Sequence, residues 1–321
     1  MLYEWECPIS TDYLILQITQ KNFPDLFLLK FEPLSGGVAN HTFMVSMSNG
    51  REYIVRISRK LDNQISYEKN LMRAASNAAD LLHKHEIPTP EVLVVDDSME
   101  LIDRPYMLST YIPANALNGI DLPMESKVTC YEEAGRVVSG LHKITGQRFG
   151  RLALMTYEEG FSTWGEAVMF EIQEWKKQAF PAKILPRDYY SKIDYVFQSH
   201  MPLLNKIEVP HLTHGDLWSG NILAEVDRGI CHFKAIIDLD QALWGDPEYD
   251  FSGGMMNDSF AKGYGRNLSN YGEDRNSYVR RKLYLLFYSL MKHYKYKCVF
   301  SDNANAQKQQ HYITRLLHEF L

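Results

Sequence analysis

Hydrophobic and polar positions near the start of the chain fall into two kinds of pattern. Over residues 9–22, apolar side chains recur at helical spacing, which predicts a short amphipathic helix. Two extended runs follow, at 42–47 and 51–58, and the turn Ser48-Asn49-Gly50 separates them. Because Asn-Gly between two strand-like runs is a strong turn signal, the pattern predicts a β-hairpin.

The pattern changes near Pro113. Before it, residues 65–84 predict a helix, and residues 92–95 and 106–112 predict two more strands, so this part reads as an antiparallel sheet with one main helix. Beyond it, helices are expected at 126–144, 164–179, 188–205, 277–297 and 306–320, with short strands between 211 and 240. We therefore expect an α+β protein with an N-terminal lobe (1–112) and a mostly helical C-terminal lobe (113–321).

Composition narrows the class of protein. The 321 residues are 45% hydrophobic and 23% charged, which is typical of a globular chain and excludes disorder or a coiled coil. A net charge of −6 argues against a basic nucleic-acid binder. The four cysteines form no CxxC pair, and neither a signal peptide nor an apolar run of membrane-spanning length is present. These features predict a cytoplasmic protein with reduced thiols and no membrane or nucleic-acid partner.

The strongest chemical signal is the segment LTHGDLWSGN, which begins at Leu212. Its His214-x-Asp216-x4-Asn221 spacing is that of a kinase catalytic loop, in which the Asp accepts the proton of the substrate hydroxyl and the Asn holds Mg²⁺. His214 is expected to brace the loop. We therefore assign Asp216 as the catalytic base and Asn221 as a metal ligand.

A second acid follows at the end of an apolar run, where Lys234–Ile237 leads to Asp238. The turn Asp227-Arg228-Gly229 predicts a hairpin that brings Asn221 and Asp238 to the same end. An Asn and Asp pair of hard oxygen ligands suits Mg²⁺, so Asp238 is the second predicted metal ligand. Asp240 is the rival, and strand alternation would turn it to the other face.

Together these motifs resemble the aminoglycoside phosphotransferase superfamily, the small-molecule kinases with a protein-kinase-like fold. His214-Gly-Asp216 with Asn221, followed by Asp238 and Gly245-Asp246-Pro247-x-x-Asp250-Phe251, matches that family's signature. The stretch LTHGDLWSGN looks most like the fructosamine kinases, whereas IIDLDQALWGDPEYDF looks like the antibiotic-kinase branch. The resemblance implies a bilobal fold that binds ATP and Mg²⁺.

The resemblance also implies cofactor-binding residues in the N-terminal lobe. Gly36 and Gly37 fall where the family has its nucleotide loop, and Arg56 falls at the position of its phosphate-binding cation. Glu68 falls where the acid that pairs with this cation lies. The run that carries Ser109 and Tyr111 matches the strand leading to the hinge between the lobes. Gly36-Gly37 lacks a full G-x-G-x-x-G pattern, and Arg59 is a competing cation.

The resemblance therefore predicts a kinase that moves the γ-phosphoryl group of ATP to a hydroxyl of an aminoglycoside-like or amino-sugar-like acceptor. A fructosamine kinase is the alternative within the enzyme class, and a catalytically silent ATP-binding pseudokinase is the alternative outside it. The run Lys292 to Lys297 is expected to be a solvated helix face. Seven acids could line a pocket for a cationic acceptor or lie on helix surfaces: Asp121, Glu125, Glu132, Glu133, Glu166, Glu171 and Glu174.

Overall fold

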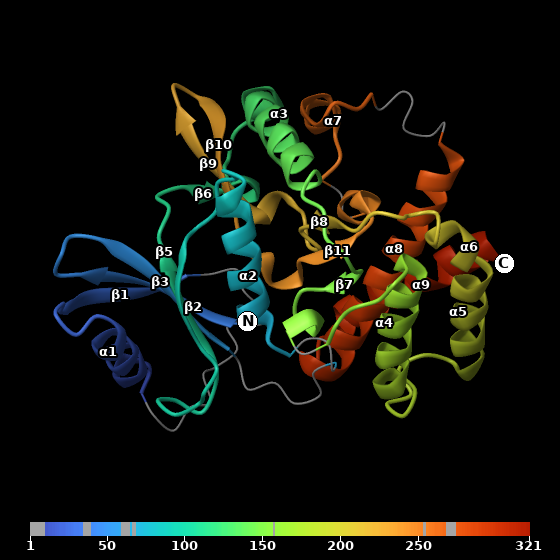
Figure 1. Cartoon of the computed structure of the whole chain (residues 1–321), viewed down its shortest axis with the longest axis horizontal. Coiled ribbons are helices and arrows are strands. Elements are labelled where there is room, and N and C mark those ends of the chain that lie inside the picture. The colour runs from blue at the N-terminus through green and yellow to red at the C-terminus, as the bar shows by residue number, and fades with distance from the viewer. Residues whose placement is uncertain are drawn as a thin grey trace. The chain divides into compact units, whose positions relative to one another are not determined.

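The computed structural model describes residues 10–34, 40–58, 65, 69–156, 158–252, 255–267 and 274–321. Its helices are α1 (Thr11–Asn22), α2 (Leu71–Lys84), α3 (Met124–Leu141), α4 (Trp164–Ala179), α5 (Arg187–Ser199), α6 (Met201–Leu204), α7 (Asp258–Tyr264), α8 (Arg275–Tyr294) and α9 (Asn303–Phe320). Its strands are β1 (Leu28–Leu34), β2 (Asn40–Met47), β3 (Glu52–Ser58), β4 (Val92–Asp96), β5 (Tyr106–Thr110), β6 (Asn115–Ala116), β7 (Gly150–Arg151), β8 (His211–Thr213), β9 (Ile222–Asp227), β10 (Ile230–Ile236) and β11 (Leu243–Gly245). Figure 1 labels these elements along the chain.

The chain divides into two compact units. The first comprises Met1–Lys60 and Pro90–Pro113, and the second comprises Leu61–Thr89 and Ala114–Leu321. The segment that carries α2 therefore belongs to the second unit, although the sequence places it with the N-terminal sheet. Within the second unit, α2 packs against the 3-10 turn Leu239–Gln241, which follows Asp238 directly. The division of the chain into functional lobes at residue 112 stays a prediction.

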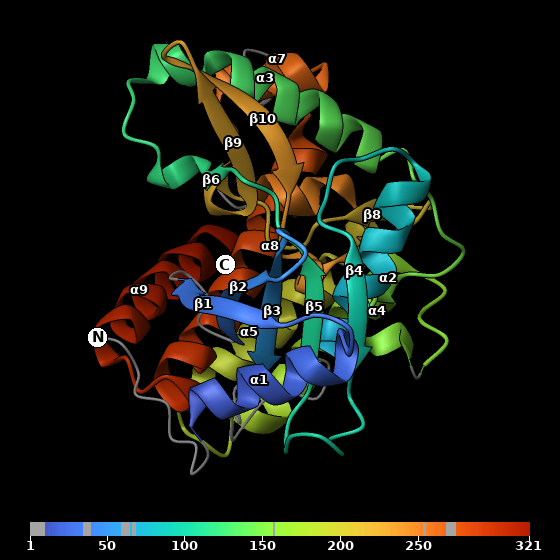
Figure 2. The ribbon, with the colours of Figure 1, turned by 90° about the vertical axis from the view of Figure 1, so that its left-hand side faces the viewer.

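The first unit is built on an antiparallel five-stranded sheet in the order β1-β2-β3-β5-β4. Figure 2 shows α1 lying across one face of this sheet. Leu14, Ile15 and Ile18 of α1 are buried against sheet residues that include Val45 and Val55. Apolar side chains on alternate positions of β2 and β3 thus form a core with one helix, because only one face of each strand is buried.

The central hairpin confirms the prediction from Asn-Gly. Strands β2 and β3 pair from Asn40↔Ser58 to Ser46↔Glu52, and Gly50 in the connecting turn has a φ of +76°. Next to it, β3 pairs with β5, and this register places Arg56 opposite Met107. Burial alternates along β3, so Val55 is buried while Arg56 lies partly exposed on the other face.

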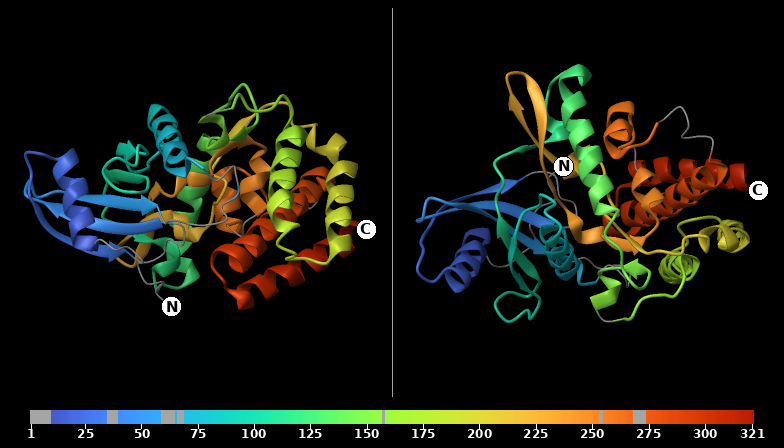
Figure 3. Two further views of the ribbon diagram at one scale, coloured as in Figure 1. Left: turned by 90° about the horizontal axis from the view of Figure 1, so that it is seen from below. Right: turned by 45° about the horizontal axis from the view of Figure 1, so that its top comes forward.

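The second unit is mostly helical, with two small sheets in the orders β10-β9-β6 and β7-β11-β8. Helix α3 packs against α7 and against β10, and α8 packs against α9. Figure 3 shows α3 in green beside the orange β9–β10 hairpin, and α8 and α9 in red as a pair. A large apolar core joins α4, α5, α8 and α9 through buried residues such as Trp164, Trp175 and Phe287.

Several boundaries differ from the prediction for physical reasons. The helix expected over 188–205 is two helices, α5 and α6, because Pro202 begins a new turn after His200. Strand β1 was missed because its burial pattern does not alternate and it contains Pro33. The two- and three-residue strands β6, β7 and β11 are too short to show a pattern. In the part of the chain that the structure describes, no helix has the length and apolar character needed to cross a membrane.

Candidate active site

The loop after β8 carries the strongest sequence motif, and its backbone explains the glycine in it. Gly215 has a φ of +79°, a region that residues with a side chain rarely adopt. A Cβ atom at this position would lie 2.0 Å from the carbonyl oxygen of Gln241. The close approach sets the loop directly against the segment that follows Asp238, so both motifs share one packed contact.

The buried carboxylate of Asp250 fixes the backbone of the loop that carries His214 and Gly215. Asp250 accepts hydrogen bonds from the backbone N–H groups of His214 and Gly215, each at 2.8 Å. His142 donates to the same carboxylate through Nε2 at 2.9 Å, and its Nδ1 accepts from the hydroxyl of Tyr264. Burial acts to raise the pKa of Asp250, but the hydrogen bond from His142, the nearby imidazoles of His142 and His214 and the backbone N–H donor of His214 outweigh burial and lower the pKa. Asp250 is therefore an ionised structural anchor of the loop.

His214 links the loop to the second motif. It is fully buried, its Nδ1 accepts from the backbone N–H of Asp216, and its Nε2 lies 2.8 Å from the carbonyl oxygen of Ile237. With Nδ1 as an acceptor, Nε2 carries the proton and donates to Ile237. His214 thus fixes the positions of the residues on either side of the site, in agreement with the bracing role expected for it.

The β9–β10 hairpin brings the remaining two residues to the same end, as the sequence predicts. The strands pair from Ile230↔Asp227 to Ile236↔Ile222, and the N–H of Ile237 donates to the carbonyl of Asn221 at 3.0 Å. The turn residues Arg228 and Gly229 both have positive φ, as a two-residue hairpin turn of type I′ requires.

At this end of the hairpin, the side chain of Asn221 contacts Asp216. Asn221 is buried, and its Nδ2 donates to the carbonyl of Asp216 at 2.8 Å and lies 3.4 Å from Oδ2 of the same residue. Asp238 is exposed, with a φ of +64°, and it begins the turn Leu239–Gln241. Asp240 lies in that turn and is buried, so the strand-alternation argument does not apply to it.

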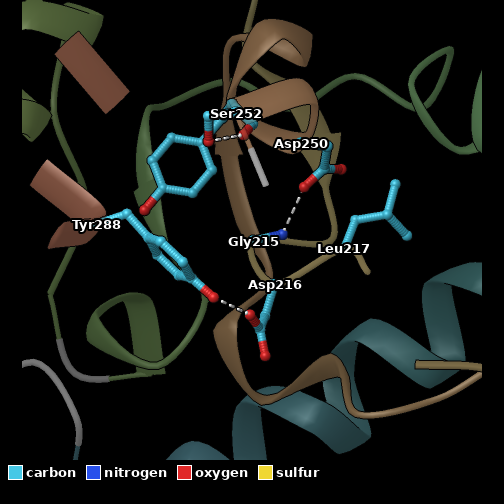
Figure 4. A pocket seen from close by; sticks show the side chains of 7 residues that line it. Gly215, Asp216, Leu217, Asp250, Ser252 and Tyr288 are labelled. Carbon is cyan, nitrogen blue, oxygen red and sulfur yellow. Dashed lines mark hydrogen bonds between the residues drawn. The ribbon is translucent and has the colours of Figure 1, made fainter. Parts of the chain in front are cut away.

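Two residues of α8 that the sequence motifs did not indicate lie near Asp216. The run Lys292 to Lys297 was expected to be a solvated helix face, but Lys292 is half-buried. Tyr288 donates from its hydroxyl to Oδ1 of Asp216 at 2.7 Å, and Figure 4 shows the tyrosine reaching the carboxylate. The Nζ atom of Lys292 lies over the Tyr288 ring, 4.2 Å from its centroid. Burial and the Asp216 charge raise the pKa of Tyr288. The available signal was the i, i+4 spacing, which places both side chains on one helix face.

A small pocket opens at this point, entirely within the second unit. Its lining residues are Gly215, Asp216, Leu217, Tyr249, Asp250, Ser252 and Tyr288, and its volume is about 10 Å³, roughly the space of one water molecule (Figure 4). Because Asp250 already accepts three hydrogen bonds, Asp216 is the carboxylate of this pocket that remains to act on a bound molecule.

Buried ion pairs fix α8 behind the pocket. Asp246 accepts from Nε of Arg280 at 2.6 Å and from the hydroxyl of Tyr284 at 2.7 Å. Glu248 pairs with Arg281 at 2.5 Å, and both side chains are buried. Since Asp246 and Glu248 lie on the segment that leads to Asp250, these contacts hold α8 against the loop anchor.

Of the six residues assigned to nucleotide binding, two lie in the sheet of the first unit. Arg56 is on β3, Ser109 is buried on β5 opposite Ile54, and Tyr111 follows the end of β5. Gly36, Gly37 and Glu68 lie outside the described residues. The role of these six residues toward a nucleotide stays a prediction.

Most of the acids that could have surrounded a cationic acceptor are occupied elsewhere. Five of the seven have partners in the structure: Glu132 with Lys262, Glu133 with the N–H of Phe233, Glu166 in its helix cap, Glu171 with Arg151, and Glu174 with Lys177. Among the described residues, no three His, Cys, Asp or Glu side chains form a cluster able to hold a metal ion. A metal ion at this site would therefore be held by Asn221 and Asp238, with oxygen atoms of the substrate or of water as its remaining ligands.

Comparison with known proteins gives the family. The model of the phosphotransferase enzyme family matches residues 30–285. A search of curated protein sequences finds no match.

Solved structures with the same fold include enzymes with bound nucleotide and antibiotic. The GDP complex of aminoglycoside 2'-phosphotransferase-IIIa has a TM-score of 0.68 at 16% identity, and the match covers 97% of this chain and 100% of the other. A thermostable mutant of aminoglycoside phosphotransferase APH(4)-Ia, in a ternary complex with AMP-PNP and hygromycin B, has a TM-score of 0.64 at 20% identity, covering 95% and 98%. A Thermobifida fusca protein that is assigned to the fructosamine-3-kinases by name alone has a TM-score of 0.66 at 18% identity, covering 95% and 98%. At these identities the comparisons establish a protein-kinase-like α+β fold, as the sequence predicts.

Proposed function

The chain belongs to the phosphotransferase enzyme family, and from this premise we propose that it transfers the γ-phosphoryl group of ATP to a hydroxyl group of a small acceptor. Family membership establishes the coarser statement, that the protein is a small-molecule kinase with an alcohol group as acceptor. The nucleotide, the metal ion and the acceptor are the parts that we propose. A cytoplasmic location belongs to the same proposal and is supported by the free thiols of Cys130, Cys231 and Cys298.

One observation carries the proposal: a hydrogen-bonded chain connects the three motif residues. Asn221 donates from its side chain to the carbonyl of Asp216, and its own carbonyl accepts from the residue that precedes Asp238. These bonds support a single site for the three residues, as phosphoryl transfer requires. In this site Asp216 orients the acceptor hydroxyl and takes its proton as the hydroxyl oxygen bonds to the γ-phosphorus of ATP, while the bond from that phosphorus to the bridging oxygen breaks and ADP leaves.

The donor atoms near Asp216 fit a magnesium ion. The amide nitrogen of Asn221 is bonded to Asp216, so its amide oxygen is the atom left to bind a metal. Asp238 supplies an exposed carboxylate at the same end of the hairpin. Carboxylate and amide oxygens are the ligands that Mg²⁺ prefers, and Mg²⁺ would neutralise phosphate charge there. Arg56 and Glu68 are proposed to hold the phosphates, with Gly36 and Gly37 covering them and Ser109 and Tyr111 beside the nucleotide.

The acceptor that we propose first is an aminoglycoside-like or amino-sugar-like molecule. Support comes from the family and from structures of the same fold that hold hygromycin B or kanamycin. A ketosamine acceptor is the second candidate, favoured by the LTHGDLWSGN segment. A direct comparison of a fructosyl-amine with an aminoglycoside as phosphate acceptor decides between them.

The test is transfer of labelled γ-phosphate from ATP to a panel of hydroxylated amines in the presence of Mg²⁺. We expect Asp216→Asn and Asp238→Ala to lower kcat by orders of magnitude, because catalysis here is mostly positioning and charge stabilisation. Asp227→Asn, at the distant end of the same hairpin, is the matched control and should leave kcat unchanged. Equal turnover in the wild type and both site variants refutes the assignment. An ATP affinity unchanged in Arg56→Ala removes Arg56 from the site.

A further inference from the structure

Lys292 is held close to the catalytic carboxylate by a single tyrosine. The hydroxyl of Tyr288 is bonded to Asp216, and the face of the same ring carries the ammonium group of Lys292 at 4.2 Å. Both side chains come from successive turns of α8, whose position is fixed by its buried ion pairs with Asp246 and Glu248. The position of Lys292 beside Asp216 is therefore built into the fold.

Lys292 also differs from the other cations that lie over aromatic rings. Among the described residues, five such cations also pair with a carboxylate: Arg151 with Glu171, Lys192 with Asp188, Arg266 with Glu248, Lys282 with Glu319, and Arg315 with Glu319. Within the same described part of the chain, Lys292 forms neither an ion pair nor a hydrogen bond. Its side chain is half-buried, and burial lowers its pKa, while Asp216 acts to raise it. Asp216 attracts Lys292 without forming an ion pair with it, so an anion in direct contact would stabilise this partly desolvated ammonium group.

We propose that Lys292 is an anion-binding residue of the acceptor site, and that the acceptor carries a carboxylate next to its reacting hydroxyl group. This inference rests on the proposed function, because it takes Asp216 as the base. The two oxygens of Asp216 separate the two sides of the site. Oδ1 of Asp216 accepts a hydrogen bond from Tyr288, whereas Oδ2 of Asp216 lies toward Asn221, the proposed metal ligand. Lys292 contacts Tyr288, the partner of Oδ1, so we assign it to the acceptor side of Asp216.

The charges around the pocket agree with this choice. Lys295, one turn further on, is also cationic and lies close enough to Lys292 to lower its pKa. Five of the seven acids that could have received ammonium groups are paired elsewhere. Among the amine-bearing acceptors proposed above, this narrows the choice to one that also carries a carboxylate, in place of a polycationic aminoglycoside, because its carboxylate meets Lys292 while its hydroxyl meets Asp216.

The experiment compares acceptors that differ only in this charge. Fructosyl-glycine and fructosyl-glycinamide, and serine and serinamide, are matched acid and amide pairs with the same hydroxyl groups. Binding of each is measured by thermal shift and calorimetry in the presence of a non-hydrolysable ATP analogue and Mg²⁺, and phosphate transfer is measured with ATP. The proteins are the wild type, Lys292→Met, Lys292→Arg, and Lys297→Met as the matched control. Lys297 is exposed on the turn after α8 and bonds to Asn303.

We expect the wild type to bind at least one acid at least tenfold more tightly than its amide. Lys292→Met should abolish this preference, Lys292→Arg should retain most of it, and Lys297→Met should retain all of it, with the KM for ATP unchanged throughout. The inference is overturned if the ratio of acid affinity to amide affinity is the same in Lys292→Met as in the wild type. It is also overturned if the wild type binds no acid more tightly than the matching amide. Binding is read separately from turnover. If the wild type prefers the acids but transfers no phosphate, the role of Lys292 is supported and the proposed function is contradicted. If phosphate is transferred only to the amides, the proposed function is supported and the role of Lys292 is contradicted.

Discussion

Replacement of Gly215 by Ala tests whether the two motifs are held together by one backbone contact. The added Cβ would lie 2.0 Å from the carbonyl oxygen of Gln241 and 2.7 Å from its carbonyl carbon. Both atoms belong to the backbone, so the strain cannot be relieved by rotation of a side chain. The positive φ of Gly215 adds about 1–2 kcal/mol for any residue with a side chain. Overpacking adds about 1–3 kcal/mol more.

Gly229→Ala is the matched control for this variant. Gly229 has nearly the same φ, +80°, but nothing lies within 4 Å of a Cβ built there. Both variants should lose about 1–2 kcal/mol of unfolding free energy because of the positive φ. Gly215→Ala should lose about 1–3 kcal/mol more because of overpacking. Urea denaturation monitored by tryptophan fluorescence measures the free energy of unfolding, and steady-state phosphate transfer measures kcat. We expect a kcat lowered at least tenfold in Gly215→Ala alone, because displacement of this loop moves Asp216. Equal destabilisation of the two variants, or an unchanged kcat in Gly215→Ala, refutes the reasoning.

Three further predictions concern the contacts around Asp216. Asp250→Asn should destabilise the protein by about 2–4 kcal/mol at pH 7, since the amide cannot accept all of the hydrogen bonds that the buried carboxylate accepts. Because the folded state lowers the pKa of Asp250, its contribution is complete above its ordinary value of 3.8 and is lost as the pH falls below it, so urea denaturation should show the variant and the wild type converging in acid. Tyr288→Phe removes a hydrogen bond to a carboxylate worth about 1.5 kcal/mol and should lower kcat about tenfold with the KM for ATP unchanged; an unaltered kcat contradicts its role. Arg280→Met leaves Asp246 buried beside fewer donors and should cost about 3 kcal/mol in urea denaturation, whereas a loss below about 1 kcal/mol shows that the pair is replaceable.

Local sequence signals were enough for the parts of the site that are close together in the chain. The x4 spacing from Asp216 to Asn221 and the turn at Arg228-Gly229 are short-range features, and the hairpin followed from them. The prediction for Asp240 rested on continuing β10 as a strand, but the chain enters the left-handed region at Asp238 and coils into a 3-10 turn. Neither the hydrophobic periodicity nor the residue propensities of this segment predict that the chain changes direction at Asp238.

The contacts that were missed join residues far apart in the sequence. His142 and Asp250 are separated by 108 positions, and Asp216 and Tyr288 by 72. Their pairing depends on how α3 and α8 pack in the second unit, which one sequence does not reveal. A buried histidine or a tyrosine on a helix is usual in any core, so neither residue type marks a site by itself.

The ion pairs at the start of α8 have a consequence for how enzymes of this type can diversify. Arg280 and Arg281 fix the rotational setting of the helix, and Tyr288 and Lys292 are two and three turns further along. One inserted or deleted residue between these points would swing both side chains by about 100° around the axis, away from Asp216. We therefore expect homologues to change their acceptor by exchanging residues on this face at constant length. Length variation should be tolerated only beyond Lys292, where a π-helical turn at Lys295–Val299 already relaxes the winding.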